Sequence, residues 1–155
     1  MLKYSVWYLL NPTNQINRLM MAYSSLFNTC KFPAHINIQC NLEKQEAVDM
    51  YHRFKSIDLP FFTGSGNPKI VKHRHYTHYK SGHVDLYTIE QPLCVNGVKI
   101  EGIHLPLAYR IDKTFTPMEL AHVHPIQRIY DNEISVCVAD TNSTDPNEWF
   151  IYMQD

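Results

Sequence analysis

Residues 35–40 (HINIQC) and 103–110 (IHLPLAYR) decide the fold, because each stretch sets a histidine at the start of an alternating segment. In the first stretch, one face carries Ile36, Ile38 and Cys40, and the other carries His35, Asn37 and Gln39. A period of two residues is the signature of a β-strand with one buried face. The sequence therefore predicts two strands, far apart in the chain, that each present a histidine.

The segments around the first of these strands alternate between extended and helical patterns. Residues 4–10 (YSVWYLL) are rich in β-branched and aromatic side chains, which is typical of a strand. Residues 15–29 repeat apolar side chains at steps of three and four, which predicts an amphipathic helix. A second helix is expected over residues 43–55. The first half of the chain thus has the order strand, helix, strand, helix.

The second half is richer in strands. Besides residues 103–110, strands are expected over residues 70–79, 83–89, 133–139 and 149–153. The pair Asn96-Gly97 is a hairpin signal, and Thr116-Pro117 is typical of a helix start. Because each half carries one histidine-headed strand, we expect a single α+β domain over residues 1–155 with two pseudo-symmetric lobes.

Composition restricts the class of partner. The 155 residues are 45% hydrophobic and 19% charged, which is globular, and the net charge of −1 argues against binding duplex DNA by counterion release. No apolar run is long enough to cross a membrane. The four cysteines form no paired motif, so we expect reduced, buried thiols and a cytoplasmic protein.

The two histidines suggest a chemistry. Imidazole exchanges protons near neutral pH, so a phosphodiester between His35 and His104 would meet a base and an acid. The base would deprotonate a 2′-hydroxyl or a water, and the acid would protonate the leaving oxygen. This reaction requires no metal and no cofactor, and we expect neither.

The chain resembles the two-histidine phosphoesterase superfamily, which includes cyclic phosphodiesterases and 2′-5′ phosphodiesterases. The stretches that carry this resemblance are YSVWYLL, FPAHINIQC, GIHLPLAY and, more loosely, DPNEWFIYM. The resemblance implies a bilobal α+β fold, with antiparallel sheets lining a central cleft and helices outside. It also implies that His35 and His104 are the catalytic acid–base pair, acting on a 2′,3′-cyclic phosphate, a 2′-5′ linkage or a cyclic oligonucleotide.

Two positions depart from the family pattern. Members carry a hydroxyl residue two positions after each histidine, where this chain has Asn37 and Pro106. The amide of Asn37 can still donate to a phosphate, whereas Pro106 has neither a side-chain donor nor a backbone N–H. By simple alternation Arg110 shares a face with His104, so Arg110 is expected to be a second phosphate donor. Trp7 is a candidate for stacking on a base.

Other interpretations stay open. The same cleft could bind a nucleotide without turnover, or the chain could be an interaction protein with no ligand. The histidine-rich segment 72–83 is interpreted as a basic, aromatic hairpin suited to single-stranded RNA rather than as a metal site. The expected partners are a nucleotide, a cyclic oligonucleotide or a short single-stranded RNA end. The Asn- and Ile-rich composition would suit a virus, in which case host nucleotide signals are a sensible target by analogy.

Overall fold

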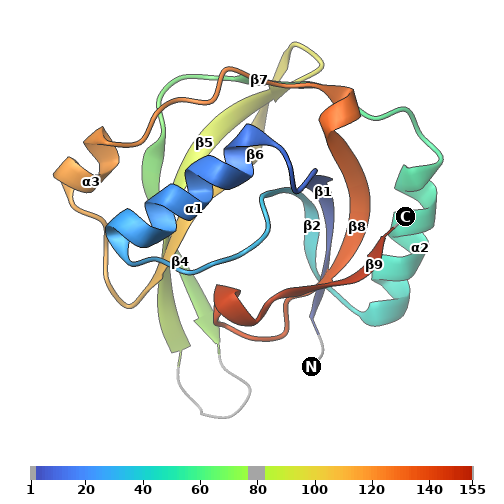
Figure 1. Cartoon of the computed structure of the whole chain (residues 1–155). Coiled ribbons are helices and arrows are strands. Elements are labelled where there is room, and N and C mark those ends of the chain that lie inside the picture. Colours follow the sequence, from blue (N-terminus) through green and yellow to red (C-terminus); the bar gives the residue numbers. More distant parts are fainter. Residues whose placement is uncertain (1–2, 77–82, 155) are drawn as a thin grey trace.

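The computed structural model describes residues 3–76 and 83–154 and shows a mixed α+β protein with two antiparallel sheets (Figure 1). The expected α+β class is confirmed. The first sheet has the strand order β2-β1-β8-β9. Its strands are β1 (Tyr4–Leu10), β2 (His35–Leu42), β8 (Ile134–Asp140) and β9 (Phe150–Gln154).

The two faces of β1 divide the surroundings of the first sheet. Tyr4 and Val6 pack in one apolar cluster with residues of helix α2 (Lys44–Lys55), which covers the outer face. Trp7 and Leu9 lie on the opposite face, in a second cluster. This division follows directly from the alternation of side chains along a strand. The odd-numbered residues Trp7 and Leu9 therefore lie on the face opposite α2.

The second sheet is built around one long strand, β5 (His83–Val95). On one side, β5 pairs first with β4 and then with β3, which in turn pairs with β7. On its other side it pairs with β6. The bounds of these partners are β3 (Phe62–Gly64), β4 (Lys69–Tyr76), β6 (Val98–Ile111) and β7 (Arg128–Ile129). In the first sheet, β2 is an edge strand, and it contacts β6 of the second sheet.

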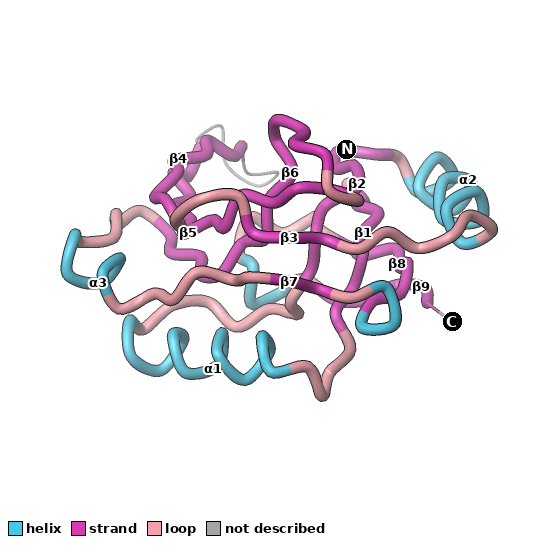
Figure 2. Tube along the Cα trace, turned by 90° about the horizontal axis from the view of Figure 1, so that it is seen from above, coloured by secondary structure: helices cyan, strands magenta, loops and turns pink. Residues whose placement is uncertain are grey.

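Helix α1 (Gln15–Phe27) packs against β6 and closes the largest apolar core (Figures 1 and 2). Its start is fixed by Asn14, whose side chain accepts a hydrogen bond from the backbone N–H of Ile16. Its end is set by Asn28, which has a left-handed backbone (φ 53°). The helix therefore ends before residue 29, where the sequence pattern placed its end. A short helix, α3 (Pro117–Ala121), begins at the predicted Thr116-Pro117 pair.

Several elements differ from expectation. β6 is longer than the predicted strand. It pairs with β5 up to the tight turn at Asn96-Gly97, so the two strands form one long hairpin. β3 lies within residues 61–68, which the sequence pattern indicates as a strand end and a loop, whereas β7 is a short strand that the pattern does not reveal. Cys40 is exposed rather than buried. The turn expected near Ser81, and with it the tip of the basic hairpin, lies outside the described residues.

Among the helices of the described residues, none combines the length and the apolar character needed to cross a membrane.

Substitution of Ile89 should test the core at the centre of β5. Ile89 is fully buried and belongs to the large cluster beneath α1, so Ile89→Ala should lower the free energy of unfolding by about 2–5 kcal/mol. Urea unfolding followed by circular dichroism measures this loss. The matched control is Ile100→Ala on β6, where the side chain is 47% exposed and a loss below about 0.5 kcal/mol is expected. Equal losses in the two variants would contradict this assignment of the core.

Candidate functional site

His35 and His104 line the same cavity, which has a volume of about 280 Å³. His35 begins β2 at the edge of the first sheet, and His104 lies on β6 of the second sheet. The contact between β2 and β6 is what brings residues from the two halves of the sequence together. Asn37 and Trp7 line the cavity as well. Both imidazoles were expected to face one cleft, and both residues line this cavity.

Both histidine rings are held in the same way. The Nδ1–H of His35 donates to the carbonyl of Pro33 at 2.7 Å, and the Nδ1–H of His104 donates to the carbonyl of Gly102 at 3.0 Å. A carbonyl oxygen can only accept, so each contact assigns the hydrogen to Nδ1 when the ring is neutral. In each case the acceptor lies two residues before the histidine. The Nε2 atom of each ring is thereby left for other partners.

His35 is buried, with 2% of its surface exposed, and its ring stacks on Trp7 with the centroids 3.7 Å apart. The pKa of His35 is lowered to about 4, mainly by burial and to a lesser degree by the nearby charge of His104, against the opposing effect of the Pro33 hydrogen bond. The His35 ring is therefore neutral at pH 7. Its Nε2 carries a lone pair, as a general base requires.

His104 is more open than His35 and has a carboxylate beside it. Its Nε2 lies 3.4 Å from Oε1 of Glu90, on the neighbouring strand β5. The same oxygen accepts hydrogen bonds from His73 Nε2 and Thr88 Oγ1, each at 2.8 Å. The carboxylate oxygen therefore lies between the two imidazole rings of His73 and His104 as a shared acceptor.

Glu90 is a buried acid that remains ionised. Burial alone would raise the pKa of its carboxyl, but the hydrogen bond from His73, the charge of His104 and the Thr88 hydroxyl together lower that pKa below its usual value. Sequence reasoning missed both Glu90 and the placement of His73 in this cavity. The signal that could have identified Glu90 is its position in β5 directly after the apolar residue Ile89, where a charged side chain is uncommon.

A β-bulge explains where the residues after His104 point. Glu90 pairs with Pro106, but the next residue back on β5, Ile89, pairs with Ala108, so Leu107 is an extra residue. An extra residue reverses the alternation that follows it. Tyr109 therefore lines the cavity beside His104 and Pro106, and Arg110 does not.

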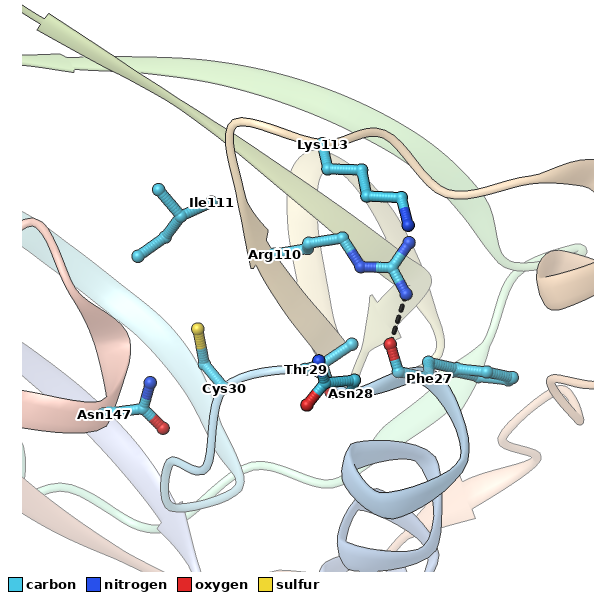
Figure 3. A pocket seen from close by; sticks show the side chains of 8 residues that line it. All are labelled: Phe27, Asn28, Thr29, Cys30, Arg110, Ile111, Lys113 and Asn147. Atoms are coloured by element: carbon cyan, nitrogen blue, oxygen red, sulfur yellow. Dashed lines mark hydrogen bonds between the residues drawn. The ribbon is translucent and has the colours of Figure 1, made fainter.

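Arg110 occupies a different cavity, of about 360 Å³, near the end of α1 (Figure 3). Its guanidinium binds the carboxylate of Glu119 through two hydrogen bonds of 3.0 and 2.6 Å and also donates to the carbonyl of Phe27. This ion pair lowers the pKa of Glu119 to about 2. The expectation that Arg110 is a second phosphate donor beside His104 is therefore corrected: the bulge at Leu107 turns it away, and Glu119 neutralises its charge.

Tyr109 brings a hydroxyl into the cavity that the sequence pattern had assigned to the opposite face. Burial raises the pKa of its phenol, and the charge of Glu90 raises it further, so the hydroxyl keeps its proton. Within the residues the structure describes, this hydroxyl makes no hydrogen bond. Tyr109 packs edge-on against Phe32 and Trp149, which hold its ring in place.

Asn37 and Trp7 differ in what they offer to a ligand. Asn37 pairs with Trp7 across β1 and β2, and its Oδ1 is buried without a hydrogen-bond partner among the described residues. Trp7 is 2% exposed and gives one ring face to His35. The indole of Trp7 therefore supports His35 rather than stacking on a nucleobase, which corrects its expected role. Trp149 is the half-buried indole on the cavity wall.

Comparisons with known proteins leave the family open. No protein-family model and no curated protein sequence matches this chain. Within the described residues, no group of three or more His, Cys, Asp or Glu side chains is arranged to hold a metal ion. The inference about chemistry therefore rests on the geometry of the cavity itself.

The buried His35 should make stability depend on pH. Its pKa is about 4 in the folded state and near 6.5 in an unfolded chain, so the unfolded state binds the extra proton between these values. Stability should be fully present above about pH 6.5 and fall by on the order of 3 kcal/mol as pH drops to about 4.

Denaturant unfolding of wild type, His35→Gln and the exposed control His122→Gln, at several pH values, measures this dependence. The slope between pH 4 and 6.5 should flatten in His35→Gln alone. An unchanged slope in that variant would show that His35 is not the titrating group.

Proposed function

We propose that this protein is a bilobal, two-histidine phosphoesterase-like enzyme that cleaves a phosphodiester in a nucleotide by acid–base catalysis without a metal ion. One observation carries the proposal: two histidines from different sheets line one cavity, each with its Nδ1 bonded to a backbone carbonyl, and the Nε2 of His104 lies beside the Glu90 carboxylate. The candidate substrates are 2′,3′-cyclic phosphates, 2′-5′ linkages and cyclic oligonucleotides.

The surroundings of the two rings favour a particular division of roles. His35 is neutral, so its Nε2 would take the proton from a 2′-hydroxyl or a water as that oxygen attacks phosphorus. His104 lies beside the Glu90 carboxylate, so its Nε2 would carry the proton that passes to the leaving oxygen as the P–O bond breaks. Two titratable groups in contrasting environments are a recurrent basis for assigning base and acid.

The phosphate needs donors as well as proton exchange. The Nδ2 of Asn37 is one, on the strand that carries His35. Two positions after His104, where family members carry a hydroxyl residue, this chain has Pro106. In our proposal the protonated hydroxyl of Tyr109, which the adjacent bulge turns toward the cavity, donates to the phosphate instead. Donors aimed at the developing negative charge are worth several kcal/mol of barrier in such sites.

A substrate screen tests the proposed activity. The protein would be incubated with 2′,3′-cyclic nucleotides, 2′-5′ oligoadenylates and cyclic dinucleotides in EDTA, with products identified by mass spectrometry. We expect cleavage of at least one class, and a loss of at least about 1,000-fold in His35→Ala and in His104→Ala. The exposed histidines supply the controls His52→Ala and His122→Ala, which should retain full activity. No cleavage of any substrate, or full activity in either cavity variant, would refute the proposal.

Tyr109→Phe tests the replacement donor. The substitution removes only the hydroxyl, which has no hydrogen bond to lose among the described residues, so the melting temperature should change little. The value of kcat should fall about 100-fold because a donor to the transition state is lost. Tyr130→Phe, at a tyrosine that is 53% exposed and outside this cavity, is the control. Unchanged kcat in Tyr109→Phe would remove Tyr109 from the mechanism.

Binding without turnover is the second candidate function, and Pro106 is the observation that favours it. This residue can donate nothing to a phosphate from its side chain or its backbone. If the Tyr109 hydroxyl does not compensate, the cavity would hold a nucleotide and release it intact. Calorimetric binding of a screened nucleotide, with no product detected by mass spectrometry, would distinguish this function from catalysis.

A further inference from the structure

The wall of the cavity along β1 continues past the histidines to a lysine. Lys3, Ser5 and Trp7 alternate onto the cavity side of the first sheet, and all three line the cavity. Trp7 is the residue stacked on His35, so Lys3 lies four residues from the histidine end, or about 13 Å along a strand. The cavity therefore has a histidine end and a lysine end.

The backbone of Lys3 is fixed although it lies close to the chain terminus. Its carbonyl accepts a hydrogen bond from the backbone N–H of Thr141 at 3.2 Å, which continues the pairing of β1 with β8. Its backbone N–H donates to the side chain of Asn142. Beside it, the hydroxyls of Ser5 and Thr141 lie 2.9 Å apart and bond to each other. The lysine end of the cavity is thus an ordered, polar surface.

Lys3 differs from the other cationic side chains near the cavities because no carboxylate among the residues that the structure describes is paired with it. In the described part of the chain, its ammonium group makes no ion pair, and it is the single Lys or Arg that lines this cavity. Arg110, by contrast, is neutralised by Glu119. Lys69 and Lys99 line a third cavity of about 790 Å³, where the carboxylate of Glu101 offsets part of their positive charge.

The size of the cavity limits what else it can contain. A volume of about 280 Å³ is at the lower end of ligand sites and is suited to about one nucleotide. A phosphodiester held at the histidines has a nucleoside on each side, so the remainder of the substrate must extend from the histidine end. The polar wall of β1 leads one such extension to Lys3.

We propose that Lys3 forms a second phosphate subsite, so that the preferred ligand is an oligonucleotide, linear or cyclic, with at least one phosphate beyond the one at the histidines. This inference rests on the proposed function only in placing one phosphate between His35 and His104. Asn37 lies on the wall between the two subsites, and its unpartnered Oδ1 would accept a hydrogen bond from a ribose hydroxyl or a base N–H of the intervening nucleotide.

Binding measurements test the subsite independently of turnover. The probes are a phosphorothioate cyclic dinucleotide, a linear dinucleotide with a terminal phosphate, and a 2′,3′-cyclic mononucleotide. Titration calorimetry at several salt concentrations would compare wild type with Lys3→Gln, Lys3→Arg and the control Lys113→Gln, an exposed lysine on the Arg110 cavity.

We expect Lys3→Gln to weaken binding of at least one dinucleotide about 5- to 10-fold and to reduce the salt dependence of its log Kd by about 0.7–0.9. Binding of the mononucleotide should change less than twofold, Lys3→Arg should restore affinity, and Lys113→Gln should match wild type. The dinucleotide that shows the loss identifies the linear or the cyclic ligand.

Equal loss for the mononucleotide and both dinucleotides, no loss for either dinucleotide, or no binding of any probe by wild type would overturn the subsite. A selective loss of dinucleotide binding in a protein that cleaves no compound of the substrate screen would uphold the subsite while the proposed catalysis fails. Cleavage by wild type, together with dinucleotide binding that Lys3→Gln leaves unchanged, would uphold the catalysis and overturn the subsite.

Discussion

Burial of the His35 ring against Trp7 is the constraint on which the rest of the site depends. A ring with so little contact with water cannot carry a charge without a large loss of stability, so it is held neutral. Its remaining N–H must then find an acceptor inside the protein, and the carbonyl of Pro33 supplies it. This single bond fixes the tautomer and leaves the lone pair on Nε2. The turn before β2 and the packing of β1 are therefore both part of the site.

The sequence could predict the elements that follow a regular period. The strand at Tyr4–Leu10, the helix that begins at Gln15 and the strand that begins at His35 lie where the pattern placed them. The predicted strand at residues 103–110 lies inside the longer β6, so His104 is within a strand rather than at its start. These segments are predictable because each buries one face, and a buried face must repeat with the period of its backbone. The joint placement of His35 and His104 is implied by the family resemblance rather than by this alternation, because a single sequence does not show how its strands pair.

The residues that sequence reasoning misplaced all lie next to backbone irregularities. Leu107 looks like any other residue of an apolar strand, yet as the extra residue of a bulge it exchanges Arg110 for Tyr109 on the cavity wall. A similar irregularity in β2, opposite Val6 and Trp7, brings Cys40 to the cavity side. A bulge has no side-chain signature of its own, because it is set by how two strands fit together. Glu90 escaped notice for a related reason: its partners come from three different strands, and a single sequence does not show their pairing.

Pro106 has a consequence for the boundary between the two sheets. β2 is the edge of the first sheet, and β6 approaches it from the second, so two rows of backbone donors and acceptors come close to each other. Exposed strand edges tend to zip together into one continuous ladder. Pro106 in β6 has no backbone N–H to offer to such a ladder, and the neighbouring bulge twists the strand there. β2 and β6 thus belong to different sheets, and the cavity lined by both histidines lies where these two strands meet.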